Sequence, residues 1–411
     1  MRLLLLEIKR VLRTRITWIL LLFALGCSIL FAYIPTTFIY FTEESDVTVK
    51  GIQAIGKYKE IRADISGEVT GDKVKNAVES VKTMLKENKV TGVYELPNDV
   101  YQKNYLPRAP LIHGLLEVYA NPKTGMAPEL LNIDSSELDH YYQDCDARLA
   151  SLMKLEQPKN TAAWSDAEEK YANVPKPYVY YSGITSDAMD YETLLLVLIL
   201  ICCAMIAAPV FSSDYQTEAD SILRCTKYGR FHLAVTKILS ALIICGVLFL
   251  VCVSVWIVTT NCLFGWESVR TSVQILFSIT SLVPWNIVQL QWNIVLVGIL
   301  SLMATVSSIL FISSRCKNQM AAMSLALFTC ILPIFLTSAL PDTIGIWFHC
   351  IWPTGAIGLQ DSILYDFIGY DYLTIGSFTM WAPYVIIIAA IVEIPLFITL
   401  TIRSYNRYNV R

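Results

Sequence analysis

The sequence of 411 residues is 55% hydrophobic and only 16% charged, a composition outside the usual range of soluble domains. Its formal net charge of −3 is too small to indicate a nucleic-acid partner. The apolar residues are concentrated in runs long enough to cross a bilayer, which takes about 20 residues per helix. We therefore expect an all-α polytopic membrane protein embedded in a lipid bilayer.

Six apolar runs are long enough to span the membrane. They cover residues 16–40, 193–211, 232–259, 292–313, 320–341 and 381–402. A basic amphipathic segment, residues 1–15, precedes the first run, and we expect it to form a helix along the inner membrane surface. Because the first apolar run continues well past Cys27, we interpret it as an uncleaved span and not as a signal peptide.

Lysine and arginine are distributed unevenly between the two sides of these runs. On one side, basic residues occur in the N-terminal segment, the loop 212–231, the turn 314–319 and the tail 403–411. On the other side, the loop 260–291 contains only Arg270 and the loop 342–380 contains none. The positive-inside rule therefore places both termini in the cytoplasm of a multi-pass protein of the cell membrane.

Between the first two runs lies a polar block, residues 43–190, that is long enough to fold around its own core. Long domains are translocated whatever their charge, so we expect this block to be extracytoplasmic. Apolar periodicity predicts a helix at 71–90, and capping patterns predict helices that open at Asp134 and Ser165. Alternation predicts an extended segment at 47–69. The block is thus expected to be a mainly helical α+β domain.

The polar loop between the second and third runs has the pattern of an amphipathic helix. Ser213 and Gln216 form a Ser-x-x-Gln capping box, and Gly229 predicts the C-terminal end. Its apolar face contains Tyr215, Ala219, Ile222 and Leu223. We interpret it as a helix that docks on a partner at the cytoplasmic face; an ordinary solvated helix is the alternative. The candidate partner-binding residues are Asp214, Tyr215, Glu218, Ile222, Leu223, Arg224, Gly229 and Arg230, together with Arg315 and Lys317 of the 314–319 turn.

Two charged residues lie inside the apolar runs. Lys237 is near the start of the third run and Glu393 is within the sixth, so both should lie in the inner half of the bilayer. Ionisable groups at that depth are costly and tend to be paired. We therefore predict a Lys237–Glu393 pair, either structural or switching between conformations.

Two outer apolar segments, 271–283 and 344–359, are too short to cross a bilayer and are predicted to be re-entrant or interfacial. The tryptophans in or beside them are Trp266, Trp285, Trp292, Trp347, Trp352 and Trp381, which either anchor the chain at the interface or line a substrate exit. In the fourth run, Gly298, Ser301, Ala304 and Ser307 recur at three-residue steps. Such small residues allow close helix packing, either within the chain or in a dimer.

Motifs of catalytic or metal-binding chemistry are absent from the sequence. The eleven cysteines include no C-x-x-C pair, and the four histidines do not cluster. We therefore expect neither enzymatic activity nor a bound cofactor or metal. A disulfide between Cys262 and Cys350, both in outer segments, remains open.

The order of these features resembles the ABC-2 type permeases, the transmembrane subunits of ABC exporters. The local match is Phe211-Ser-Ser-Asp214-Tyr215 followed by Leu223 and Gly229-Arg230, which is similar to the F-x-x-[DE]-Y…L…[GS]-R run of the family's first cytoplasmic loop. The resemblance covers the whole membrane portion. The large outer domain departs from short family members and resembles peptide- or antibiotic-handling branches of bacterial Gram-positive type.

The resemblance implies a separate ATP-hydrolysing subunit that receives residues 212–228 as a coupling helix, with a second, smaller contact at 314–319. It also implies a second permease copy or a homologous permease as partner. The expected function is export of a peptide, antibiotic or other amphipathic substrate. A membrane sensor or receptor, in which the outer domain binds a ligand and a partner protein carries the signal, is the alternative from another class.

Overall fold

The computed structural model describes residues 2–42, 48–134, 137–226, 229–359, 362–376 and 378–407. Its long apolar helices are α2 (Arg15–Thr37), α9 (Ser186–Ala207) continued by α10 (Pro209–Gln216), α12 (Phe231–Phe264), α14 (Ile287–Arg315), α15 (Gln319–Ala339) and α18 (Ala382–Arg407). They make up six candidate membrane spans within the described residues, which confirms the predicted number.

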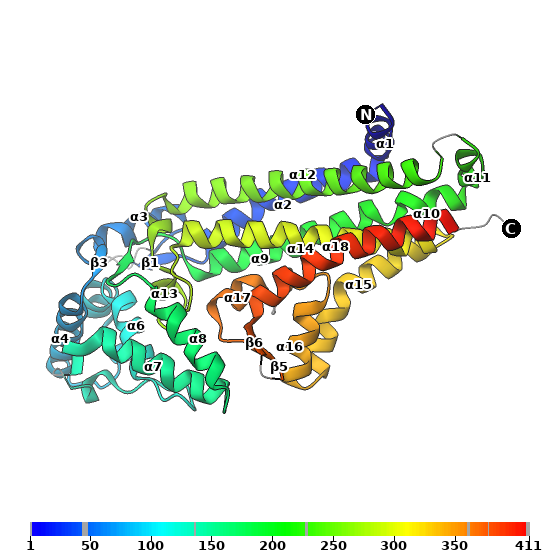
Figure 1. Ribbon diagram of the computed structural model, residues 1–411. Helices are drawn as coiled ribbons and strands as arrows, with labels where there is room; N and C mark the ends of the chain where they lie inside the picture. The colour runs from blue at the N-terminus through cyan, green and yellow to red at the C-terminus, as the bar shows by residue number, and fades with distance from the viewer. Residues whose placement is uncertain are drawn as a thin grey trace.

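These spans differ in how much of their surface other parts of the chain cover. In α14, 72% of the apolar window is buried, whereas only 17% is buried in α15 and in α18. α14 is therefore the core of the bundle, and α15 and α18 present apolar faces outward, as helices in contact with lipid do. Figure 1 shows α14 beside α9, α12 and α18, all of which contact it.

The bundle has two distinct ends (Figure 1). Both chain termini lie at one end, which we call the terminal end, together with the short helices α1 (Arg2–Leu12) and α11 (Ala219–Arg224). The polar domain between α2 and α9 lies at the opposite end, which we call the domain end. Helix α1 exposes Leu5 and Leu6 while burying Glu7, so it has the amphipathic character predicted for residues 1–15.

The domain is mainly helical with small antiparallel sheets. Its elements are β1 (Tyr40–Thr42), β2 (Thr48–Lys50), α3 (Ile52–Ile61), β3 (Gly67–Val69), α4 (Gly71–Glu87), α5 (Asn98–Val100), α6 (Ala109–Tyr119), α7 (Tyr141–Glu156), α8 (Thr161–Ala172) and β4 (Tyr178–Tyr180). Strand β1 pairs with β2, and β3 pairs with β4 in the register Gly67 to Tyr180. The second pairing ties the start of the domain to its end.

Helix α4 confirms the helix predicted at 71–90. Thr70 caps it, because its hydroxyl accepts a hydrogen bond from the backbone N–H of Lys73. The predicted apolar face is buried along its whole length, at Val74, Ala77, Val78, Val81 and Leu85. Here local capping and apolar periodicity agree, so the sequence predicts the element closely.

The extended segment predicted at 47–69 is wrong for most of its length. Helix α3 occupies Ile52–Ile61 and buries Ala54 and Ile55 against the core, whereas strands cover only its two ends. Gly51 lies between β2 and α3 with φ of 64°, a value that favours glycine and lets the chain turn out of the strand. In a short run of mixed residues the apolar positions fit both the repeat of a helix and the alternation of a strand. The sequence alone therefore did not distinguish a helix from a strand here.

The two other predicted helices of the domain begin elsewhere. α8 begins at Thr161, four residues before the predicted Ser165, because the side chain of Asn160 caps it by accepting from Ala163 N–H. α7 begins at Tyr141, after a single 3-10 turn at Glu137–His140. Ser135 and Ser136 of the predicted cap lie outside the described residues.

The segment 271–283 is not a re-entrant helix. It contains only the short helix α13 (Val273–Leu276), and the rest packs into the domain. The carbonyl of Ile279 accepts hydrogen bonds from Tyr171 and Tyr178, at 2.8 and 3.3 Å. The carboxylate of Glu117 accepts from Ser278 Oγ at 2.6 Å. The apolar residues of this segment therefore complete the core of the domain.

The segment 344–359 contains the second half of α16 (Asp342–Ile351) and a loop that returns to the bundle. The carbonyl of Pro353 accepts hydrogen bonds from the hydroxyls of Ser301 and Thr305, at 3.0 and 2.8 Å, midway along α14. Helix α17 (Ile363–Ile368) and the hairpin of β5 (Tyr372–Ile375) and β6 (Phe378–Trp381) then lead into α18.

These contacts also decide between two readings of the small residues on α14. Ser301, Ala304 and Ser307 are buried within the chain, and a Cβ at Gly298 would lie 3.1 Å from the Phe249 ring. The small residues therefore serve packing within one chain.

Two of the predicted interfacial tryptophans, Trp266 and Trp292, are more than half exposed, whereas Trp381 is buried. No disulfide joins Cys262 to Cys350, both of which the structure describes.

Candidate functional site at the terminal end

The junction between α9 and α10 positions the predicted docking segment. Pro209 lacks an N–H group, and the hydroxyl of Ser313 from α14 enters the helix ladder there. Ser313 Oγ donates to the carbonyl of Ala208 at 2.6 Å and accepts from the N–H groups of Phe211 and Ser212, at 3.0 and 3.2 Å. The direction of α10 is therefore held by a side chain of the bundle core.

The docking segment is bent and is not the single helix predicted from its capping box. Ser213 lies inside α10, which continues the second span and ends at Gln216. Glu218 then adopts a left-handed conformation with φ of 57°, and α11 begins after it. Pro209 starts α10 four residues before Ser213. The Ser213–Gln216 capping box therefore lies inside this helix and does not begin a new one. Of the predicted 212–228 helix, Lys227 and Tyr228 lie outside the described residues.

A cluster of four charged residues joins α1, α10 and α12. Lys237 Nζ lies 2.6 Å from Asp214 Oδ2 and 3.6 Å from Glu7 Oε2. Arg10 lies 2.6 Å from Asp214 Oδ1 and 2.9 Å from Glu7 Oε2. Each carboxylate is therefore shared by two cations. Since Lys237 is fully buried and Asp214 nearly so, the cluster is the kind of paired arrangement that makes charge tolerable in a low-dielectric interior.

The predicted Lys237–Glu393 pair is wrong. Lys237 is paired with Asp214, and Glu393 forms neither an ion pair nor a hydrogen bond with the described residues. The helix of Glu393, α18, runs mainly along α14, whereas the face of α12 around Lys237 packs on α1 and α10. Depth in the membrane could be estimated from the sequence, but the helix faces that meet could not. Glu7 and Arg10 were missed because they resemble ordinary charges of a surface helix.

A second cluster fastens α11 to the end of α18. The Arg224 guanidinium lies 4.3 Å from the ring centroid of Tyr405 and 5.9 Å from that of Tyr215. Its Nε is 3.5 Å from Asp220 Oδ2. The hydroxyl of Tyr405 donates to the carbonyl of Gly229 at 3.4 Å. Cation–π contacts of this kind contribute about 0.5–2 kcal/mol each. Tyr405 has no recognisable sequence pattern, so only the packing shows its role.

Position 229 has room only for glycine. A Cβ at this position would lie 1.8 Å from the carbonyl oxygen of Leu223, so any other residue would have to displace the backbone of α11. The predicted helix end at Gly229 therefore corresponds to a close approach between two turns of chain, five residues beyond the end of α11.

Of the remaining predicted residues, Leu223 is half-buried and packs against the core, whereas the others face outward. Ile222 is 74% exposed, an unusual value for an isoleucine in an ordered helix. Glu218, Arg230, Arg315 and Lys317 are also exposed. The N–H of Gln319 donates to Gln216 Oε1 at 3.2 Å and so holds the 314–319 turn against the end of α10. We call Glu218, Ile222, Arg230, Arg315 and Lys317 the terminal-end surface.

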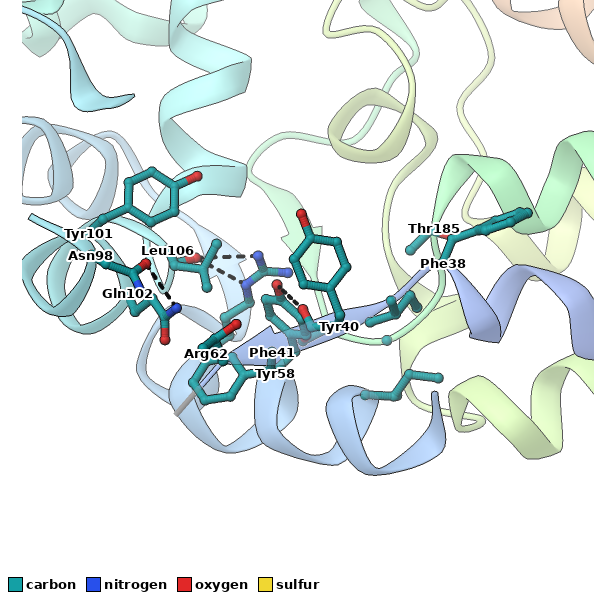
Figure 2. Close-up of a pocket in the computed structure, with 15 residues that line it drawn as sticks. Phe38, Tyr40, Phe41, Tyr58, Arg62, Asn98, Tyr101, Gln102, Leu106 and Thr185 are labelled. Atoms are coloured by element: carbon teal, nitrogen blue, oxygen red, sulfur yellow. Dashed lines mark hydrogen bonds between the residues drawn. The ribbon is translucent and has the colours of Figure 1, made fainter. Parts of the chain in front are cut away.

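A recess of about 460 Å³ lies at the opposite end of the bundle, where α2 and α9 meet the domain (Figure 2). Tyr40, Phe41, Tyr58 and Tyr101 form its aromatic wall, and Arg62 is the single charged residue among the described residues that line it. No sequence motif indicates this recess, because its residues come from four separate stretches of chain.

A comparison with known protein families gives a match. A model of the family described as "ABC-2 family transporter protein" matches residues 14–403, which includes all six candidate spans to within a few residues of the C-terminal end. A search of proteins with curated functions finds no match.

Proposed function

This chain belongs to the ABC-2 family of transporter proteins, and we propose that it is the permease subunit of an ATP-driven exporter. A separate subunit would hydrolyse ATP and bind the terminal-end surface. The observation that carries this proposal is Ile222, which is exposed on α11 while the residues around it are fastened to the spans. The family match gives no support to the alternative of a sensor or receptor.

We place the terminal end in the cytoplasm, where ATP is available. Both termini lie there (Figure 1), as do α1 with Arg2 and Lys9 and the last residues of α14 and α18, which include Arg315 and Arg403. Lysine and arginine near membrane ends favour the cytoplasmic side. The domain would then be extracytoplasmic, in line with its position at the opposite end of the bundle.

The two clusters supply a mechanical path from the docking surface to the spans. A displacement of α11 would be transmitted through Arg224 and Tyr405 to α18. A displacement of α10 would be transmitted through Asp214 to Arg10 of α1 and Lys237 of α12. We therefore assign Asp214, Tyr215, Arg224 and Gly229 to transmission within the chain, since they are largely covered by it, and assign direct docking to the exposed residues.

The substrate would be a peptide, an antibiotic or another amphipathic molecule that moves along the bundle. The loop after α16 reaches the middle of α14, and in a membrane such irregular backbone is tolerated where it is covered by protein or lines a path. A second permease copy, or a homologous permease, would cover part of the outward apolar faces of α15 and α18.

The docking role predicts a specific effect of Ile222→Glu. Removing an apolar anchor from the centre of an interface costs about 2 kcal/mol or more, which corresponds to about thirtyfold weaker binding. The tagged chain is purified from its native membrane, and the amount of ATP-hydrolysing subunit retained is measured by mass spectrometry and by ATPase activity. Wild type should retain the subunit, and Ile222→Glu should lose most of it.

The matched control is Met126→Glu. Met126 is also 74% exposed but lies in the domain, so this variant should retain the subunit like wild type. Two results would contradict the proposal. One is a wild-type chain that retains no ATP-hydrolysing subunit, and the other is equal retention by both variants.

A further inference from the structure

The recess at the domain end is an elongated cavity with two chemically different ends (Figure 2). Arg62, Asn98 and Gln102 lie toward one end, within the domain. Phe38 and Thr185 lie toward the other end, where Phe38 follows the last turn of α2 and Thr185 directly precedes α9. Its volume, about 460 Å³, is within the range of small-molecule sites.

Arg62 is held in place but is not neutralised. Its Nε and Nη2 donate to the carbonyl of Leu106, both at 3.3 Å, and its Nη1 donates to the hydroxyl of Tyr180 at 3.3 Å. The guanidinium also lies 4.5 Å from the Tyr58 ring centroid. None of the described residues places a carboxylate within ion-pair distance of it. Burial, and in addition the charge of Arg62, lowers the pKa of His113 in the neighbouring helix α6.

Two buried hydroxyls on the wall of the recess have no partner within the described chain. Ser182 Oγ and Thr185 Oγ1 are both excluded from solvent and form no hydrogen bond there. Leaving a buried hydroxyl unbonded costs about 1–3 kcal/mol, so such groups mark places where a ligand or water completes the structure. The loop between these two residues packs closely on the end of α12. Gly183 allows this approach, since a Cβ there would lie 2.4 Å from the carbonyl oxygen of Phe264.

We propose that this recess binds the anionic head of an amphiphile, a phosphate or a carboxylate, with its apolar tail lying along Phe38 toward the ends of α2 and α9. The uncommitted N–H groups of the Arg62 guanidinium are donors suited to an oxyanion, and the two hydroxyls without partners can donate to a polar group farther along the amphiphile, such as an ester. The aromatic wall suits the first carbons of a tail, and the end at Phe38, which is 52% exposed, lies where α2 ends and α9 begins.

The ligand has two possible sources, a membrane phospholipid or a free anionic amphiphile, and the same chemistry recognises both. This inference does not rest on the export function, because it depends only on the recess. Loss of the ATP-hydrolysing subunit in the experiment above would therefore leave it unaffected.

Native mass spectrometry of the full chain, released from a neutral detergent, provides the test. The probes are phosphatidylglycerol and phosphatidylcholine of equal chain length, then decyl phosphate. We expect retention of one phosphatidylglycerol or one decyl phosphate per chain, with about tenfold lower retention in Arg62→Gln, the effect of losing one charged hydrogen-bonding group. Phosphatidylglycerol retained over phosphatidylcholine identifies the membrane as the source, and decyl phosphate alone identifies a free amphiphile.

Two further variants separate binding from folding. Thr185→Val removes an unpartnered hydroxyl at nearly constant volume, so it should lower retention of phosphatidylglycerol, whose ester groups follow its phosphate, without lowering the melting temperature of the ligand-free chain. Arg108→Gln is the matched control, because Arg108 is a half-buried arginine of the same domain that donates to the carbonyl of Asn104 outside the recess. Equal retention by Arg62→Gln and Arg108→Gln, or no retention of either anionic probe by wild type, would overturn the proposal.

Discussion

Asp214 and Glu192 are both carboxylates buried among the spans, and their surroundings are opposite. Asp214 lies between Arg10 and Lys237, so its charge is compensated on two sides. Glu192 of α9 is 1% exposed, and neither of its carboxylate oxygens has a partner among the described residues. An ionised carboxylate without compensation in a low-dielectric interior costs several kcal/mol, whereas a well-paired one does not.

This difference predicts opposite effects for two conservative substitutions. Glu192→Gln replaces a carboxyl group whose charged form has no compensation by a neutral amide of the same shape, and it should leave the melting temperature equal or higher. Asp214→Asn leaves Arg10 and Lys237 with only Glu7 and should destabilise the chain by about 3 kcal/mol or more. Thermal unfolding of both purified variants in one detergent at pH 8 measures this. A larger loss for Glu192→Gln than for Asp214→Asn would refute the assignment.

Among single residues, the sequence singled out Asp214, Arg224 and Lys237, but it paired Lys237 with the wrong residue and did not reveal the contacts of the other two within the chain. The reason is that an ion pair depends on two helix faces meeting, and its members here are far apart in the chain: Arg10 and Asp214 are separated by 204 positions. The local sequence also does not show whether a side chain is exposed. Ile222 and Tyr215 occupy equivalent positions in the amphipathic pattern, but Ile222 faces solvent and Tyr215 packs on Tyr405.

At the level of elements, the direction of the docking segment depends on one hydroxyl. Ser313 of α14 lies between the carbonyl of Ala208 and the N–H of Ser212, where it replaces their direct backbone bond and fastens the junction of α9 and α10 to α14. The buried N–H groups of Phe211 and Ser212 would lose this acceptor if the hydroxyl were removed. A side chain of the central helix therefore helps to hold the proposed docking surface in place.

Ser313→Ala is expected to lower the free energy of unfolding by about 1–3 kcal/mol, because it leaves buried backbone groups unbonded. Ser307→Ala is the matched control on the same helix. Ser307 is equally buried, but its hydroxyl donates only to the carbonyl of Met303 in its own helix, which already belongs to the backbone ladder. Thermal unfolding should show a clear loss for the first variant and little for the second. Similar losses would mean that the inserted hydroxyl has no special role.

The elements that the sequence predicts well are those whose caps and periodicity agree, such as α4 and the long apolar helices. It fails where one pattern fits two structures. The stretch at 47–69 contains residues suitable for a strand and forms mainly α3, and Ser213–Gln216 has the form of a helix start but lies within α10. In both cases packing against other elements selects between conformations of similar local energy.

At the scale of the whole molecule, the two ends of the bundle should lie on opposite sides of the membrane. Cys225 is exposed just after α11 at the terminal end, and Met126 is exposed in the domain. In cells that express Met126→Cys, a membrane-impermeant maleimide should label position 126 from outside and Cys225 only after the membrane is permeabilised. Peptide mapping distinguishes the sites. Labelling of Cys225 in intact cells would require the opposite orientation.

By itself the sequence determined the class of the protein, the number of spans, the presence of a polar domain between the first two and the resemblance to ABC-2 permeases. These follow from properties that are local along the chain, since bilayer thickness requires a long apolar run and a long polar stretch can bury its own core. Only the tertiary structure decided the partners of Lys237, the bend before α11, the internal role of the small residues on α14 and the recess around Arg62. Each of these depends on which surfaces meet when distant segments pack. The sequence of a single segment does not show which other segments it will contact.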